Sequence, residues 1–335
     1  MGRRSVWSEQ RILAMTSQFA CAADEVWRLQ RDDDPECRWF RTAVRGNAEP
    51  VQHSMQGTYV ITPQGLLLAR INSANPDRVL KMLTKALAKW RSMSDAERSA
   101  PGQPAPQPVH RWEDSYPEAG LALERFARDV GVAPHDAKRI PVNRDAVWFS
   151  AEELQGWLPE AIVGASIDVK PRLLERLMRF VLVDNVRGQT LPYARAELQG
   201  CGLRSKVLAI RGSQIDLELT GHSKAAAKGP WLDGDNYWKP RHEFPRQLST
   251  HMFGLATFDR DTSRFTAFDL VATGERQGRT TFNGRAKEKA GSTHRIGFLL
   301  RLADPHYRVA PTFLNMYRAK WVVRPPNKPK PEQKH

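Results

Sequence analysis

The chain has 335 residues, of which 41% are hydrophobic and 26% are charged, so it is long enough for two globular domains and ordinary in composition for them. No apolar run approaches the roughly 20 residues that span a bilayer, and polar residues follow the basic start, so we expect no membrane partner and a cytoplasmic location unless a leader was removed. Three scattered cysteines argue against a disulfide framework or a zinc knuckle, while the net charge of +14 raises the question of nucleic-acid binding.

The first part of the chain alternates between helical and extended patterns. Apolar residues at helical spacing predict helices over residues 7–15 and 34–44. Between them, the apolar segment at residues 19–23 predicts a short buried strand. These three elements precede the most informative stretch of the sequence, which begins at Gly57.

That stretch combines a hairpin pattern with a helical one. Residues 58–62 and 66–71 are rich in β-branched, aromatic and apolar side chains around a Pro-Gln-Gly turn, which predicts a β-hairpin. Asn75 as an N-cap and Pro76 at the first helical position then predict a helix. Its apolar stripe comprises Val79, Met82, Leu83, Ala86, Leu87 and Trp90.

In this order, the helix, strand, helix, hairpin and helix resemble the thioredoxin-like superfamily over roughly residues 5–92. The resemblance implies a truncated and divergent α/β domain that begins at the family's active-site helix. The chain contains no C-x-x-C, and Gln56-Gly57-Thr58 precedes the hairpin strand where the family has a cis-proline. The resemblance therefore implies a redox-inactive scaffold or docking surface rather than a dithiol oxidoreductase.

Composition predicts the division of the chain. Proline-rich residues 94–111 have the composition of a semi-rigid linker, which places a thioredoxin-like domain at 1–93 and a second domain at 112–325. Residues 326–335 form a basic, proline-rich tail.

The second domain begins with helical patterns and ends with alternating ones. We predict helices over residues 117–130, after the Ser150–Glu153 capping box, and along the stripe at 173–178, which leads into a strand at 179–184. Hairpins then follow at 203–219 and 251–273, with a further strand at 296–303. This order predicts an α+β domain on an antiparallel sheet that curls into a barrel or a sandwich.

The segment at residues 231–245 is the best candidate for a ligand-binding site because rigid aromatic side chains alternate with polar ones. Its spacing fails as an EF-hand, since Tyr237 and Phe244 occupy positions that need oxygen ligands, and we predict no metal site from motif spacing. In the alternative interpretation, the tryptophans only cap one end of the sheet. The candidate ligand-binding residues are Trp231, Asp233, Asp235, Asn236, Trp238, His242 and Glu243.

Two further candidates carry weaker signals. Cys37 lies near a predicted helix start, where the helix dipole favours a thiolate, although the neighbouring carboxylates oppose it. A basic cluster between residues 276 and 295 fits an exposed hairpin loop that contacts polyanions. Its members are Arg276, Arg279, Arg285, Lys287 and Lys289.

Three hypotheses about function follow. The first is a redox-inactive thioredoxin-like scaffold joined to a β-rich domain that binds a small ligand or a protein partner. The second is an enzyme, either an atypical thiol oxidoreductase that uses Cys37 or an acid–base or metal enzyme with its site at residues 231–243. The third is nonspecific nucleic-acid binding through the basic tail and cluster. No phosphate-binding glycine motif or G-x-S-x-G occurs, so the sequence predicts no nucleotide or dinucleotide cofactor and leaves any other cofactor unknown.

Overall fold

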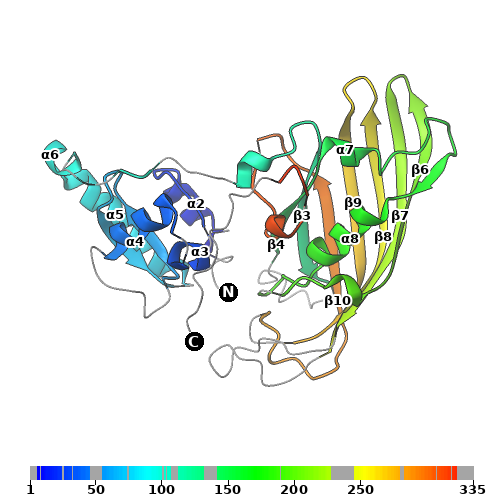
Figure 1. The fold of residues 1–335 in the computed structure, drawn as a ribbon. Coiled ribbons are helices and arrows are strands. Elements are labelled where there is room, and N and C mark those ends of the chain that lie inside the picture. Colours follow the sequence, from blue (N-terminus) through cyan, green and yellow to red (C-terminus); the bar gives the residue numbers. More distant parts are fainter. Residues whose placement is uncertain are drawn as a thin grey trace, which may run out of the picture. The chain divides into compact units, whose positions relative to one another are not determined.

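A computed structural model gives the structure of the chain, which divides into two compact units, Met1–Arg111 with the chain's last residues and Trp112–Arg324 (Figure 1). The structure describes residues 6–322 except 8, 25, 32, 46–54, 74, 100–101, 103, 107–111, 132–141, 189, 228–244, 280–282, 307 and 318. Within this part of the chain, no helix is both long and apolar enough to cross a lipid bilayer.

The first unit contains a β-hairpin and several helices. The hairpin pairs antiparallel, with Thr58 opposite Ile71, as the sequence predicts. The N-cap of the longest helix is also confirmed, because the side chain of Asn75 accepts a 3.1 Å hydrogen bond from the Arg78 N–H. The elements are α2 (Gln10–Thr16), α3 (Val26–Arg31), α4 (Pro35–Arg45), β1 (Thr58–Ile61), β2 (Leu67–Ile71), α5 (Pro76–Ser92) and α6 (Asp95–Arg98).

A small core holds the first unit together. Val79, Met82 and Leu83 of α5 pack with Ile12 of α2 and Val60 of β1. The strand predicted at residues 19–23 is wrong: this segment is irregular and mostly exposed, because its alanines and cysteine bury little apolar area. Since the described sheet of this unit has two strands, the thioredoxin-like resemblance stays a prediction. The predicted linker begins with a helix, α6, rather than with extended chain.

Among its described residues the second unit contains one large antiparallel sheet, which confirms the antiparallel part of the predicted fold class. The described strands follow the order β4-β3-β10-β9-β8-β7-β6-β5, in which β4 and β5 form the two edges. The expected closure into a barrel or pairing into a sandwich is therefore not seen among them. The strands are β3 (Leu121–Asp129), β4 (Asn143–Phe149), β5 (Ser166–Asp168), β6 (Leu198–Arg211), β7 (Gln214–Ala227), β8 (Arg246–Asp259), β9 (Arg264–Gln277) and β10 (His294–Leu302).

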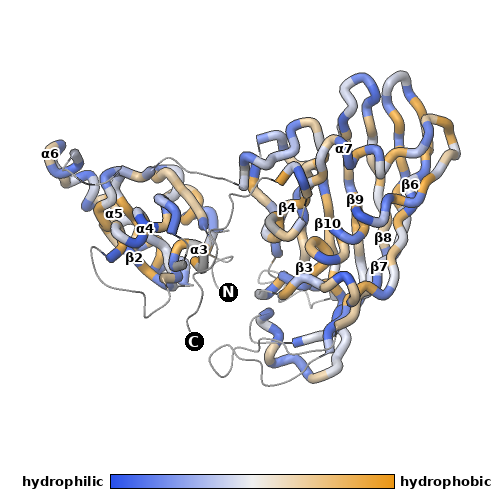
Figure 2. The backbone as a smooth tube through the Cα atoms, in the orientation of Figure 1, coloured by the Kyte–Doolittle hydropathy of each residue, from blue (hydrophilic) through white to orange (hydrophobic). Residues whose placement is uncertain are grey.

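Helices cover one face of this sheet, which we call the inner face (Figure 1). Trp157 is fully buried there and makes edge-to-face contacts with Phe149 and Phe268, at ring separations of 5.3 and 5.6 Å. Hydrophobic and hydrophilic residues alternate along the long strands (Figure 2), so that one face is apolar. The helices are α7 (Ala151–Leu154), α8 (Pro171–Arg176), the π-helical turn Leu177–Val181, and the 3-10 turns Trp112–Ser115, Arg195–Glu197 and Leu314–Met316.

Two predicted elements of this unit are wrong. The segment predicted as a helix at 117–130 contains strand β3, whose inward positions include buried Arg125 and Asp129, so charged residues hide the alternation. The strand predicted at 179–184 is instead a π-helical turn that continues α8, followed by irregular chain. The sequence also gave no signal for β4, which begins with three polar residues.

The two ends of the sheet differ in the length of their connections. At one end, which we call the hairpin end, tight turns join β6 to β7 and β8 to β9. At the other, the loop end, residues 130–142, 228–245 and 278–293 connect the strands. Long connections are where binding residues concentrate, since a rigid sheet positions them. The loop end is therefore the first place to look for a site.

Candidate functional site

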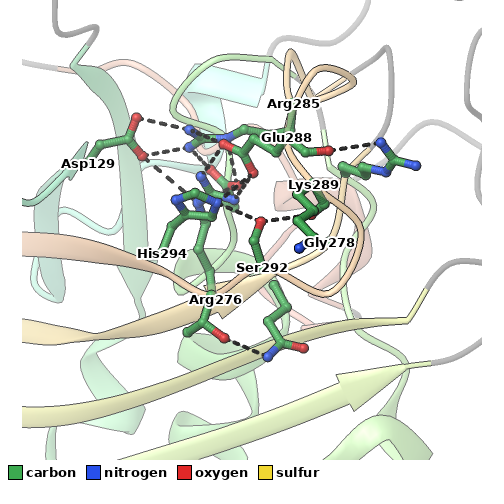
Figure 3. A network of polar contacts seen from close by, with 12 residues as sticks. Asp129, Arg276, Gly278, Arg285, Glu288, Lys289, Ser292 and His294 are labelled. Atoms are coloured by element: carbon green, nitrogen blue, oxygen red, sulfur yellow. Dashed lines mark hydrogen bonds and ion pairs between the residues drawn. The ribbon is translucent and has the colours of Figure 1, made fainter. Parts of the chain in front are cut away.

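A buried arginine, Arg285, organises the loop end (Figure 3). Its guanidinium donates hydrogen bonds of 2.7 and 2.9 Å to the two carboxylate oxygens of Asp129, at the end of β3. On another edge it donates bonds of 2.9 and 3.2 Å to Asp184, in the chain that follows the π-helical turn. One side chain thus joins the 278–293 connection to two distant parts of the unit. It makes two hydrogen bonds to each carboxylate, the bidentate geometry that a guanidinium favours.

A second arginine, Arg276 at the end of β9, extends this network. It donates bonds of 2.9 and 2.6 Å to the carboxylate of Glu288, and its Nε lies 3.3 Å from Asp184. Arg276 and Arg285 expose only 2% and 1% of their side chains. Arg187 completes the set, because its Nε donates a 2.8 Å bond to Asp129. We call these six residues, Asp129, Asp184, Arg187, Arg276, Arg285 and Glu288, the ionic cluster.

The cluster keeps Asp129 and Glu288 ionised. Burial favours neutral Asp129, but hydrogen bonds from Arg285 and Arg187 outweigh it and hold the pKa of Asp129 below its ordinary value. Glu288 behaves alike: burial opposes its charge, yet Arg276 and Arg285 lower its pKa. The same contacts raise the pKa of Arg285 against the effect of its burial. Asp129, Glu288 and Arg285 are therefore fixed charges rather than proton donors or acceptors near neutral pH.

A small pocket adjoins the cluster. Its volume of about 10 Å³ has room for roughly one water molecule. Arg246, at the start of β8, lies on one wall with its guanidinium 4.3 Å from the ring centre of Tyr193 and donates a 2.9 Å bond to the Pro192 carbonyl. The buried side chains of Arg246 and Arg276 place two cations on the walls of this pocket, beside the start of β8.

Ser292 and His294 lie beside Glu288 but do not form a catalytic triad. The Ser292 hydroxyl lies 2.7 Å from the Lys289 carbonyl and 2.8 Å from His294 Nε2. Because the carbonyl can only accept, the serine proton is directed to it, and the imidazole N–H donates to Ser292. Glu288 is 3.6 Å from the same nitrogen rather than from Nδ1. Serine activation needs the reverse arrangement, so this geometry does not supply a nucleophile.

The structure separates the predicted polyanion-binding residues into two groups. Arg276 and Arg285 are not on an exposed loop, because both are buried and paired with carboxylates. Arg279 is half-buried and donates a 2.8 Å bond to the Glu288 carbonyl, while Lys287 and Lys289 are exposed. Sequence spacing does not join the acidic members of the cluster, because they are far apart in the chain and Asp129 fell within a predicted helix.

The other sequence-predicted residues lie elsewhere. Trp231, Asp233, Asp235, Asn236, Trp238, His242 and Glu243 all fall outside the described residues. Cys37 is fully buried in α4, where its N–H donates a 2.9 Å bond to the Asp34 carboxylate and its sulfur lies 3.2 Å from the other carboxylate oxygen. A thiol that faces a carboxylate is stabilised in its protonated form, which disfavours thiolate chemistry at this position.

Among the described residues, no group of three or more histidine, cysteine or carboxylate side chains could hold a metal ion. Comparisons with known proteins find no matching family model, no matching characterised protein and no matching solved structure. The geometry of the loop end is therefore the basis for a functional proposal.

Proposed function

We propose that the eight-stranded unit binds an acidic ligand, one that carries a carboxylate or a phosphate, at the loop end, and that the first unit is a redox-inactive, thioredoxin-like scaffold. The observation that carries the proposal is the charge left after internal pairing. Within the cluster three arginines balance three carboxylates, so the excess positive charge comes from Lys287 and Lys289, which are exposed beside it. Arg187, a member of the cluster, also exposes part of its side chain. The rim of the loop end is therefore positive.

Arg187 is the residue best placed to meet such a ligand. Its side chain is 42% exposed, and its Nε is held by Asp129. Within the described residues the terminal nitrogens of its guanidinium donate no hydrogen bond, and a guanidinium binds carboxylate or phosphate through two parallel hydrogen bonds. Since Arg285 in turn holds Asp129, the position of Arg187 is fixed before the ligand arrives, which lowers the entropic cost of binding.

Backbone packing brings the two lysines to the same rim. Gly284 has a φ of +69°, and a Cβ there would lie 2.8 Å from the Arg187 carbonyl oxygen. The 278–293 connection, which carries Lys287 and Lys289, therefore runs directly against the segment that carries Arg187. Strand β7 also ends, and β8 begins, at this end of the sheet, where Ala227 pairs with Arg246.

Titration calorimetry of the full chain with inorganic pyrophosphate and with citrate tests the proposal. The triple variant Arg187→Gln, Lys287→Gln, Lys289→Gln should weaken binding at least about tenfold, because each lost charged contact is worth about 1.5–3 kcal/mol. The control is Arg204→Gln, Arg211→Gln, Arg264→Gln, which removes the same charge from exposed positions away from the loop end. If both triple variants lost the same affinity, the loss would follow from net charge alone, and the proposed site would be rejected.

A second candidate function, nonspecific nucleic-acid binding, is favoured by the net charge of +14. It predicts affinity for a short single-stranded oligonucleotide that falls steeply with salt and with deletion of residues 326–335. If the chain without residues 326–335 lost oligonucleotide binding but still bound pyrophosphate and citrate, the two functions would be shown to be separate.

A further inference from the structure

The outer face of the large sheet, opposite α7 and α8, carries an apolar strip near its centre. Phe253 and Leu255 of β8 are 54% and 51% exposed, and Val271 of β9 is 43% exposed. The strand register places Val271 between Phe253 and half-buried Leu299 of β10. Adjacent exposed apolar side chains on an otherwise polar face mark an interaction surface. We call Phe253, Leu255, Val271 and Leu299 the outer strip.

Charged residues on the same face accompany the strip in a definite order. At one level across four neighbouring strands lie Glu218 (β7), Leu255 (β8), Asp269 (β9) and Arg301 (β10). The Arg301 Nε donates a 3.0 Å bond to Asp269, so these two charges are already paired. The level thus has Glu218 at its β7 side and the paired Arg301 at its β10 side. On the flanking strands Lys206 (β6) lies opposite Glu218, and Glu124 (β3) lies opposite Arg301.

We propose that the outer strip is the interface between two copies of this chain, stacked outer face to outer face about a two-fold axis that runs parallel to the strands between β8 and β9. Such an axis keeps every residue at its own level and exchanges β8 with β9 and β7 with β10. A two-fold interface uses the same patch on both copies, so the patch must be complementary to itself.

The outer face meets this condition through two kinds of contact, although the same axis also places Leu255 of one copy over Asp269 of the other. Phe253 of one copy lies over Val271 of the other, and this contact occurs twice. Glu218 of one copy lies over Arg301 of the other, also twice, so that opposite charges meet on both sides of the strip. At the next level His251 meets Thr273. Closer to the loop end Lys224 would face Arg295, so the contact ends before that level.

The contact is small, and it forms between chains that each carry a net charge of +14. An interface of this extent supports weak association, with a dissociation constant on the order of 10 µM. Sedimentation velocity of the full chain over a concentration series, at physiological ionic strength, should show a monomer–dimer equilibrium. A chain that stays monomeric throughout would overturn the proposal.

Charge reversal identifies the interface. In a dimer of the Glu218→Arg variant, an arginine at 218 in each copy faces Arg301 of the other copy. In a dimer of the Arg301→Glu variant, a glutamate at 301 in each copy faces Glu218 of the other. Because like charges then meet twice, each variant should self-associate at least about tenfold more weakly. An equimolar mixture of the two variants restores both opposite-charge contacts and should associate again as a heterodimer. Circular dichroism verifies that each variant is folded.

The matched control is Glu118→Arg with Arg308→Glu, which reverses a separate exposed ion pair. Its dimerisation should equal that of the unmodified chain. Dimers that persist in both single variants, or a mixture that fails to associate, would overturn the proposed two-fold contact.

Discussion

Arg285 donates hydrogen bonds to two carboxylates that come from different parts of the second unit. Replacing it by methionine leaves Asp129 and Asp184 buried without this partner, and the loss of one member of a buried ion pair costs about 3–5 kcal/mol. We therefore expect Arg285→Met to lower the free energy of unfolding in urea by about that amount. Arg295→Met, at an exposed position of β10, should change it by less than about 0.5 kcal/mol. Equal effects would mean that the cluster contributes no particular stability.

The lowered pKa of Asp129 has a consequence for acid stability. A carboxyl group whose pKa is lower in the folded than in the unfolded chain stabilises the fold above its ordinary pKa of 3.8. That contribution is lost as the pH falls through the lower, folded pKa. Asp129→Asn removes it at every pH, so the stability difference between this variant and the unmodified chain should narrow below about pH 4. A difference that stays constant in urea unfolding from pH 7 to pH 3 would contradict the assignment.

The three cysteines should react very differently with a thiol reagent. Cys21 and Cys201 are exposed, whereas Cys37 is buried against Asp34. We expect iodoacetamide to modify the first two in the native chain and Cys37 only after unfolding, as measured by peptide mass spectrometry. Preferential modification of Cys37 near neutral pH would instead support the thiol-enzyme hypothesis.

At the scale of elements, glycines in the strands divide into two kinds. A Cβ on Gly274 of β9 would lie 1.8 Å from the Ser249 carbonyl oxygen of β8, whereas a Cβ on Gly200 of β6 would meet nothing within 4 Å. Gly274→Ala must therefore displace backbone and should lower the thermal unfolding midpoint, with a cost of at least about 1–3 kcal/mol. Gly200→Ala should be neutral or slightly stabilising. Similar midpoints for both variants would mean that β8 and β9 are not packed this closely.

The predicted elements succeeded where one physical signal dominated. Alternation along β7 and β8 and the capping of α5 by Asn75 are local signals, and the structure confirms both. Strand β3 was missed because Arg125 and Asp129 occupy inward positions that a half-buried strand ordinarily fills with apolar residues. Both charges have partners from outside β3: Asn143 of the neighbouring strand β4 bonds one nitrogen of Arg125, and Arg285 of a distant segment bonds Asp129.

At the scale of the whole molecule, the two units bury separate cores. Ile12, Val79 and Leu83 belong to one, and Trp157, Phe268 and Phe298 to the other. The predicted domain limits at 93 and 112, the linker at 94–111 and the tail at 326–335 remain predictions, and most of the linker lies outside the described residues.

The candidate site could be predicted only in part from the sequence. The basic residues at 276–289 stand out by composition, but nothing local shows that Arg276 and Arg285 turn inward while Lys287 and Lys289 stay exposed. That division depends on Asp129 and Asp184, which the fold brings together from residues far apart in the chain. Composition thus indicated a basic surface, while topology decides which cations are free to meet a ligand.

Hydrogen–deuterium exchange of the full chain, with and without inorganic pyrophosphate, tests the central claim most directly. If an acidic ligand binds at the loop end, amide exchange should slow at residues 184–190 and 283–294 and stay unchanged in the turns at 211–214 and 259–264. Protection confined to the hairpin end, or no protection anywhere, would contradict a ligand site at the loop end.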